Sequence, residues 1–113
     1  MLSDILNRAC ELLDEDPVEA QTGLLGDLCV ATHDALARQL RAGVSPVDCW
    51  DNFSLAAALL AADAMQAIRR GGVSKFDAGT LALSFEGSPM AALAGRLMGP
   101  WLAGGLYFRS VAT

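Results

Sequence analysis

The stretch "LAAALLAADAMQAI", from Leu55 to Ile68, restricts how this chain can fold more than any other feature of it. It is apolar almost all round, with Asp63 and Gln66 as its polar interruptions. A helix of this kind is buried on most of its sides, either at the centre of its own domain or between subunits. The chain has 113 residues, which suffices for one domain with one modest core. We therefore predict a single domain, residues 1–113, built around this helix.

The start of the same helix carries a clear signal. In "SPVD", Ser45 occupies the N-cap position, Pro46 the first helical position, and Asp48 the position of a capping-box acid. Aspartate is shorter than the preferred Glu or Gln, so the box is imperfect. The helix should end at "RRGG", where cations meet the carboxyl end of the helix dipole and glycines break the chain.

Three further helices complete the prediction. A first short helix has Ser3 and Asp4 as candidate caps and ends before the acidic "DEDP". A second begins between Pro17 and Leu24 and ends before Gly43, and "SP" at Ser88-Pro89 opens a last helix that runs to about Leu102. The inner stripes of the first two are Leu2, Ile5, Leu6, Ala9, Leu12 and Leu13, then Leu25, Leu28, Cys29, Thr32, Leu36 and Leu40. The predicted fold class is mainly α, a small four-helix domain.

One segment between the last two helices has a different period. Leu81, Leu83 and Phe85 alternate with polar or small residues, as in a strand with one covered face, while Phe76 falls on the other parity. A turn at Gly79 would produce that change, which predicts a short β-hairpin or extended segment. A lone hairpin is marginal in water, so it must lie on a helix or add to a neighbour's strand. Its strands would be about Val73–Phe76 and Thr80–Phe85.

Composition favours association with other protein chains. Hydrophobic residues make up 53% of the chain, more than a small monomer usually hides, so we expect a homo-oligomer. The net charge of −5 and the scattered Lys and Arg residues argue against specific binding to nucleic acid. The apolar stretch near the carboxyl end contains Arg96 and Pro100, which argues against a membrane span. Three widely spaced cysteines imply no disulfide framework and suit a reducing cytoplasm.

Residues with catalytic or metal-binding chemistry are few. Cys29 and His33 share a helical face, and Cys49 could in principle join them, but zinc sites usually contain close cysteine pairs. We interpret Cys29 as a core cysteine beside a surface histidine. Asp48 is better used by the cap, and Asp63 by an ion pair with Arg70 or with a partner subunit. The sequence thus predicts no enzyme, no cofactor and no metal site.

The carboxyl end predicts an interaction segment. Gly104 and Gly105 break the last helix, so residues 104–113 should form an extended tail. Tyr107, Phe108 and Arg109 in this tail have the composition of a binding anchor, although Leu106 and Phe108 could instead fold back onto the subunit's own helices. The candidate interface residues are Phe76, Leu81, Leu83, Phe85, Trp101, Tyr107, Phe108 and Arg109.

The order of these elements resembles the small head–tail connector proteins of tailed phages, prophages and gene transfer agents, also called adaptor or head-completion proteins. "PVDCWDNFSLAAALLAADAM" resembles their alanine-rich helix, "GVSKFDAGTLALSF" their short extended segment, and "LMGPWLAGGLYFRSV" their closing helix and tail. The resemblance spans roughly residues 24–111. It departs at Thr80, where the family often has an acid after the glycine.

The resemblance implies a structural subunit that forms a ring and joins the portal to the tail. Such a protein would be cytoplasmic until it is assembled into the virion, with the portal and tail proteins as its partners. The alternative from a different class is a cytosolic helical interaction module, a dimeric regulatory subunit without catalytic activity.

Overall fold

The computed structural model describes residues 2–14, 23–71 and 88–103. These contain the helices α1 (Leu2–Leu13), α3 (Leu24–Ala37), α4 (Trp50–Gly71) and α6 (Pro89–Met98). The 3₁₀ turn η1 (Pro46–Cys49) leads directly into α4, and a second 3₁₀ turn, η2 (Gly99–Trp101), directly follows α6. The predicted mainly α fold with four helices is confirmed.

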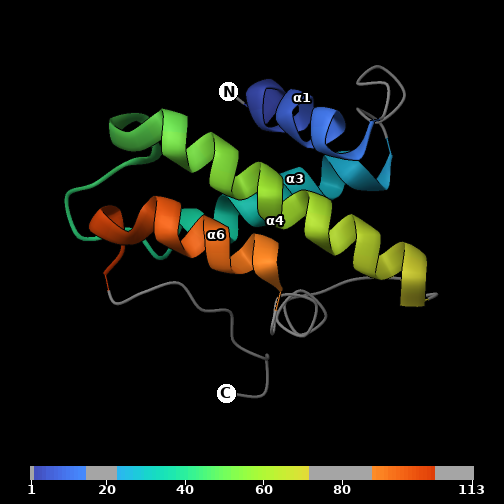
Figure 1. The fold of residues 1–113 in the computed structure, drawn as a ribbon. Coiled ribbons are helices and arrows are strands. Elements are labelled where there is room, and N and C mark those ends of the chain that lie inside the picture. Colours follow the sequence, from blue (N-terminus) through green and yellow to red (C-terminus); the bar gives the residue numbers. More distant parts are fainter. Residues whose placement is uncertain (1, 15–22, 72–87, 104–113) are drawn as a thin grey trace, which may run out of the picture.

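Helix α4 is the centre of the arrangement (Figure 1). It runs across the molecule with α1 above it, α6 below it and α3 behind it, and it packs against all three. Every residue from Phe53 to Ala64 except the half-buried Leu55 is buried. Burial then decreases, since Met65 to Ile68 are half-buried and Arg69 is exposed. The prediction that this apolar helix is buried on most sides is confirmed, within a single subunit.

The many alanines of α4 explain how three helices can reach it. An alanine adds no side chain beyond Cβ, so the distance between packed helices is set by the larger residues of the neighbours. Asp63, with 7% exposure, is buried in the same helix. We had interpreted Asp63 as pairing with Arg70 or a partner, and the Arg70 side chain lies outside the described residues.

Helices α1 and α3 turn their predicted stripes toward α4. In α1 the buried residues are Ile5, Leu6, Ala9 and Cys10, whereas Leu12 is 41% exposed. In α3 they are Leu25, Leu28, Cys29, Thr32 and Leu36, as predicted, whereas Leu40 of the predicted stripe lies beyond the helix and is half-buried. The buried hydroxyl of Thr32 donates over 3.2 Å to the backbone oxygen of Ala57, so a polar contact joins α3 to α4 inside the core.

The helix ends follow the local sequence, with three corrections. Helix α3 ends at Ala37 and does not run up to Gly43, because the N–H groups of Gln39 and Leu40 bond three residues back in tighter turns. Because α1 begins at Leu2, Ser3 and Asp4 lie in its first turn and are not caps. Asp14 takes a positive φ of 57° directly after α1, where the acidic "DEDP" begins. The last helix does not continue as α-helix to Leu102. Pro100 has no N–H to donate to the Arg96 oxygen, which instead accepts from Gly99, and the chain tightens into η2.

The hairpin predicted between the last two helices is not borne out, because residues 73–85 lie outside the described part of the chain. Within that part, extended pairing is limited to one antiparallel bridge between Leu40 and Leu102. The predicted tail, residues 104–113, also lies outside it. No helix among the described residues is long and apolar enough to cross a membrane.

Candidate functional site

Trp101 is the one predicted interface residue that the structure describes. It is half-buried in η2, next to the start of α4. The other predicted interface residues lie outside the described ranges, so the structure neither brings them together nor separates them. They are Phe76, Leu81, Leu83, Phe85, Tyr107, Phe108 and Arg109.

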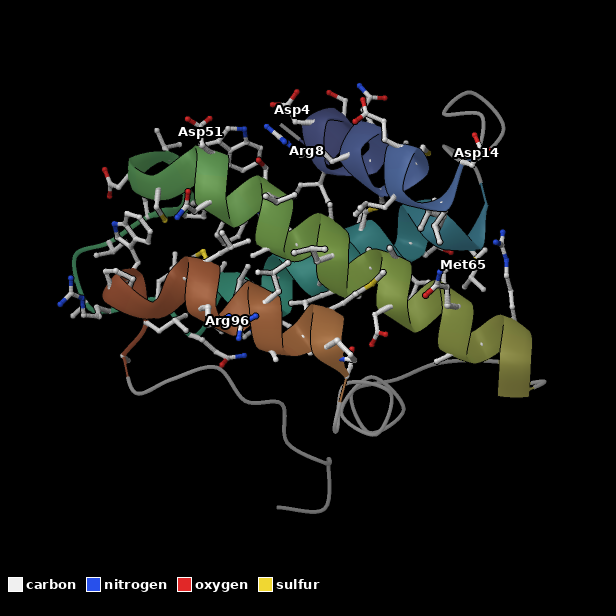
Figure 2. All side chains as sticks on the ribbon, viewed as in Figure 1. Asp4, Arg8, Asp14, Asp51, Met65 and Arg96 are labelled. Atoms are coloured by element: carbon white, nitrogen blue, oxygen red, sulfur yellow. The ribbon has the colours of Figure 1, made fainter. Side chains whose placement is uncertain are left out.

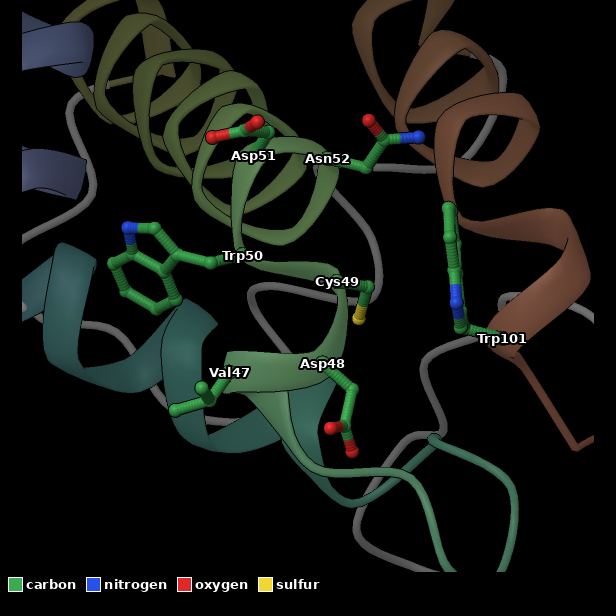
Figure 3. Close-up of a pocket in the computed structure, with 7 residues that line it drawn as sticks. All are labelled: Val47, Asp48, Cys49, Trp50, Asp51, Asn52 and Trp101. Atoms are coloured by element: carbon green, nitrogen blue, oxygen red, sulfur yellow. The ribbon is translucent and has the colours of Figure 1, made fainter.

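Beside Trp101 lies an open hollow of about 370 Å³ (Figure 3). The two tryptophans flank η1 on opposite sides, and the Trp101 indole stands edge-on in this view beside Cys49 and Asp48. We call this feature the η1 hollow. Its lining residues are Val47, Asp48, Cys49, Trp50, Asp51, Asn52 and Trp101.

The predicted cap fixes the position of Asp48, one of the residues that line the η1 hollow. The backbone N–H of Ser45 donates to Asp48 Oδ2 over 2.8 Å, and the Ser45 hydroxyl donates to the same oxygen over 3.1 Å. Aspartate is short, so both bonds converge on one carboxylate oxygen and η1 forms a tight 3₁₀ turn before α4 begins. The prediction that Asp48 serves the cap is confirmed.

Three hydrogen bonds fix the walls of the η1 hollow to other elements. Trp50 Nε1 donates to Asp4 Oδ2 of α1 over 3.0 Å, and Asn52 Nδ2 donates to the Leu97 oxygen of α6 over 2.8 Å. The backbone oxygen of Trp101 accepts from the Arg41 N–H over 2.9 Å. Figure 2 shows Asp51 at the start of α4 and Asp4 on the neighbouring α1. The residues that line the hollow are thus tied to α1, to α6 and to the loop after α3.

An aromatic row continues from this hollow into the core. The Trp50 ring stacks on Phe53, with 5.7 Å between centroids and 23° between planes. The His33 ring meets Phe53 edge to face, with 5.3 Å between centroids. Phe53 itself is fully buried. Stacking of this kind stabilises one position of the Trp50 indole, against the ring of Phe53.

The environments of Cys29 and Cys49 favour the protonated thiol. Burial raises the pKa of Cys49, and the adjacent Asp48 carboxylate raises it further. Burial, with a smaller contribution from Cys10, raises the pKa of Cys29 to about 12. A thiolate is the form that attacks or binds a metal, so neither cysteine is set up as a nucleophile.

His33 is engaged with its own helix. Its Nδ1 lies 3.0 Å from Asp34 Oδ1, and its side chain is 24% exposed while Cys29 is buried. Among the described residues, no three His, Cys, Asp or Glu side chains lie close enough to hold a metal ion. Our interpretation of Cys29 as a core cysteine is confirmed by its 1% exposure.

Sequence reasoning missed the η1 hollow as a feature. Val47, Trp50 and Asn52 carried no motif, and Asp48 had been assigned to the cap alone. Trp50 and Trp101 come to line the same hollow through the packing of distant elements, and their positions in the sequence give no signal of it. Comparisons with protein-family models, with curated proteins and with solved structures find no match to this chain.

Proposed function

We propose that this chain is a structural subunit of the phage head–tail connector type, which forms a homo-oligomeric ring and joins a portal to a tail. The observation that supports it is the order of elements. Helices α1 and α3 precede an alanine-rich α4 buried along most of its length, and α6 closes the described part. The segment "GVSKFDAGTLALSF" that carries the resemblance stands between α4 and α6.

The exposed surface of the described residues suits a subunit that meets several neighbours. Large hydrophobic side chains are exposed on four different elements, namely Leu12 on α1, Val30 on α3, Val47 on η1 and Leu93 on α6. Val47 is the most exposed of them, at 67%. Single exposed apolar residues are common, and they offer contact points on several faces.

The mass of the purified protein in solution tests the proposal. A connector subunit is expected to form a closed ring of many copies, alone or on its portal, visible by electron microscopy. A stable dimer with no affinity for a portal would favour the alternative of a helical regulatory module. Genes for portal and capsid proteins upstream and tail proteins downstream would support the connector role.

The variant Leu83→Asp tests the predicted interface segment. We expect it to abolish ring formation while helical circular dichroism stays nearly intact, because the segment serves a neighbour. Asn7→Asp, which adds the same charge at an exposed polar residue of α1 that is not among these contact points, is the control and should still assemble. If Leu83→Asp unfolds the subunit, the segment belongs to its own core.

Deletion of residues 106–113 tests the tail as a binding anchor. A soluble, helical protein that no longer binds portal or neighbouring subunits would support that role. Full binding by the shortened chain would remove the tail from the mechanism. Precipitation would show that Leu106 and Phe108 cover the subunit's own helices.

A further inference from the structure

The η1 hollow combines an aromatic face with negative charge. Asp48 and Asp51 are both exposed, and no Lys, Arg or His is among the residues that line the hollow. The indole of Trp101 stands beside Asp48 and Cys49, with one face toward them (Figure 3). We infer that this hollow binds an arginine side chain presented by a partner protein.

The charge balance of the hollow favours a cation. The amino end of α4 contributes about half a positive charge, which by itself would repel a cation. Two carboxylates outweigh it, so the net local charge is negative. Arg41 bonds to Trp101 through its backbone, but its side chain is exposed and is not among the residues that line the hollow.

The geometry favours arginine over lysine. A guanidinium group is planar, so it can stack on an indole face while one of its N–H groups donates to a carboxylate oxygen, whereas an ammonium group has no flat face to stack. Both bonds from Ser45 go to Asp48 Oδ2, so Oδ1 keeps its capacity to accept. The volume of about 370 Å³ lies at the lower end of the range of small-ligand pockets, about 300–1,000 Å³, and suits one side chain.

The inference rests on the proposed function only in placing the arginine on an assembly partner. The binding of a guanidinium group by the hollow is a property of the isolated subunit and is measured separately. A subunit that binds arginine but never assembles would refute the ring proposal and leave this inference standing.

A titration with a blocked pentapeptide, Gly-Ser-Arg-Ser-Gly, tests the inference. The chain has two tryptophans, so its ¹H–¹⁵N spectrum contains two indole signals that substitution can assign. We expect saturable movement of the Trp101 signal at millimolar peptide. The same peptide with citrulline, which keeps the shape and removes the charge, should move it far less.

Two variants in the hollow and one control outside it locate the binding site. Asp48→Asn keeps an oxygen that can accept from Ser45 but removes the charge, and it should raise the dissociation constant about three- to tenfold, as expected for the loss of a charge-assisted bond. Asp27→Asn changes the net charge equally at an exposed residue outside the hollow and should bind as the wild type does. Trp101→Leu should abolish binding; if circular dichroism shows that it is unfolded, Asp48→Asn decides. Equal responses to arginine and citrulline, or unchanged affinity in Asp48→Asn, would overturn the inference.

Discussion

The middle of α4 and its amino end are held against the neighbouring helices by different kinds of interaction. In the middle, alanines and leucines are enclosed by three helices, and the buried polar contact of Thr32 runs to backbone oxygens. At the amino end, side chains of Trp50 and Asn52 reach outward to α1 and α6 and leave a hollow between the elements. The first region is organised by burial and the second by bridging hydrogen bonds.

The contrast indicates where substitutions should affect stability and where they should affect binding. A buried side chain cannot be shortened without leaving a cavity, whereas a hydrogen bond at the surface is replaced by water at little cost. We therefore expect large losses of stability around Leu60 and small ones around η1. Residues around η1 can therefore serve in recognition, since substitutions there should cost little stability.

The largest effect is expected for Leu60→Ala. Leu60 is fully buried in the middle of α4, so its truncation should lower the free energy of unfolding by about 3 kcal/mol. Leu55→Ala, in the same helix at a half-buried position, is the matched control and should cost clearly less. Urea unfolding followed by circular dichroism measures both. Equal losses would show that α4 is not enclosed as described.

Alkaline pH should weaken the core through Cys29, a buried residue of α3. Its thiol has a pKa of about 12 in the folded protein against an ordinary 9.0, so the folded state holds the proton that the unfolded state releases. The contribution is fully present below pH 9 and is lost as the pH rises toward 12. At pH 10 the loss is on the order of 1 kcal/mol.

The measurement is urea unfolding at pH 8 and pH 10 for the wild type and for Cys29→Ala. The two proteins share every other titratable group, so the difference between their pH dependences isolates Cys29. Parallel behaviour of the two proteins would contradict the burial of this thiol.

Removal of one hydroxyl in each region gives a direct comparison. Thr32→Val keeps the shape but leaves the oxygens of Cys29 and Ala57 without this donor, which should cost about 1 kcal/mol. Ser45→Ala removes an exposed bond to Asp48 while the backbone bond remains. We therefore expect it to lower the stability by only a few tenths of a kcal/mol. Thermal melts of both variants test the order, and the reverse order would refute the distinction between the regions.

A small effect is also expected at the indole of Trp50. Trp50→Phe retains a ring to stack on Phe53 but loses the exposed bond to Asp4, so the cost should be about 0.5 kcal/mol. A double-mutant cycle with Asp4→Ala isolates the bond. A coupling energy above about 1.5 kcal/mol would place Trp50 among the groups that hold the fold together.

Helices and caps were predictable from the sequence because their signals are local. Ser45, Pro46 and Asp48 carry the start of α4 within four residues, and the spacing of Leu25, Leu28, Thr32 and Leu36 marks the buried side of α3. The end of α6 was predicted too late because Pro100 was not weighed as a missing donor inside a helix.

The η1 hollow could not be predicted in this way. It depends on how α6 packs beside α4, which brings Trp101 to the residues around Trp50. The bond from Asn52 to the Leu97 oxygen is likewise a tertiary contact, and an asparagine near a helix start has many other uses. Local patterns give the elements, and packing between distant elements gives the site.

The bridge between Leu40 and Leu102 has a mechanical consequence. It is flanked by the bonds from Arg41 N–H to the Trp101 oxygen and from Ala103 N–H to the Gln39 oxygen, at 2.9 and 3.0 Å. A pulling force applied to the chain beyond Ala103 therefore reaches the loop after α3 before it reaches α6. The load is divided between two elements that are far apart in sequence, so α6 is protected from being peeled off α4.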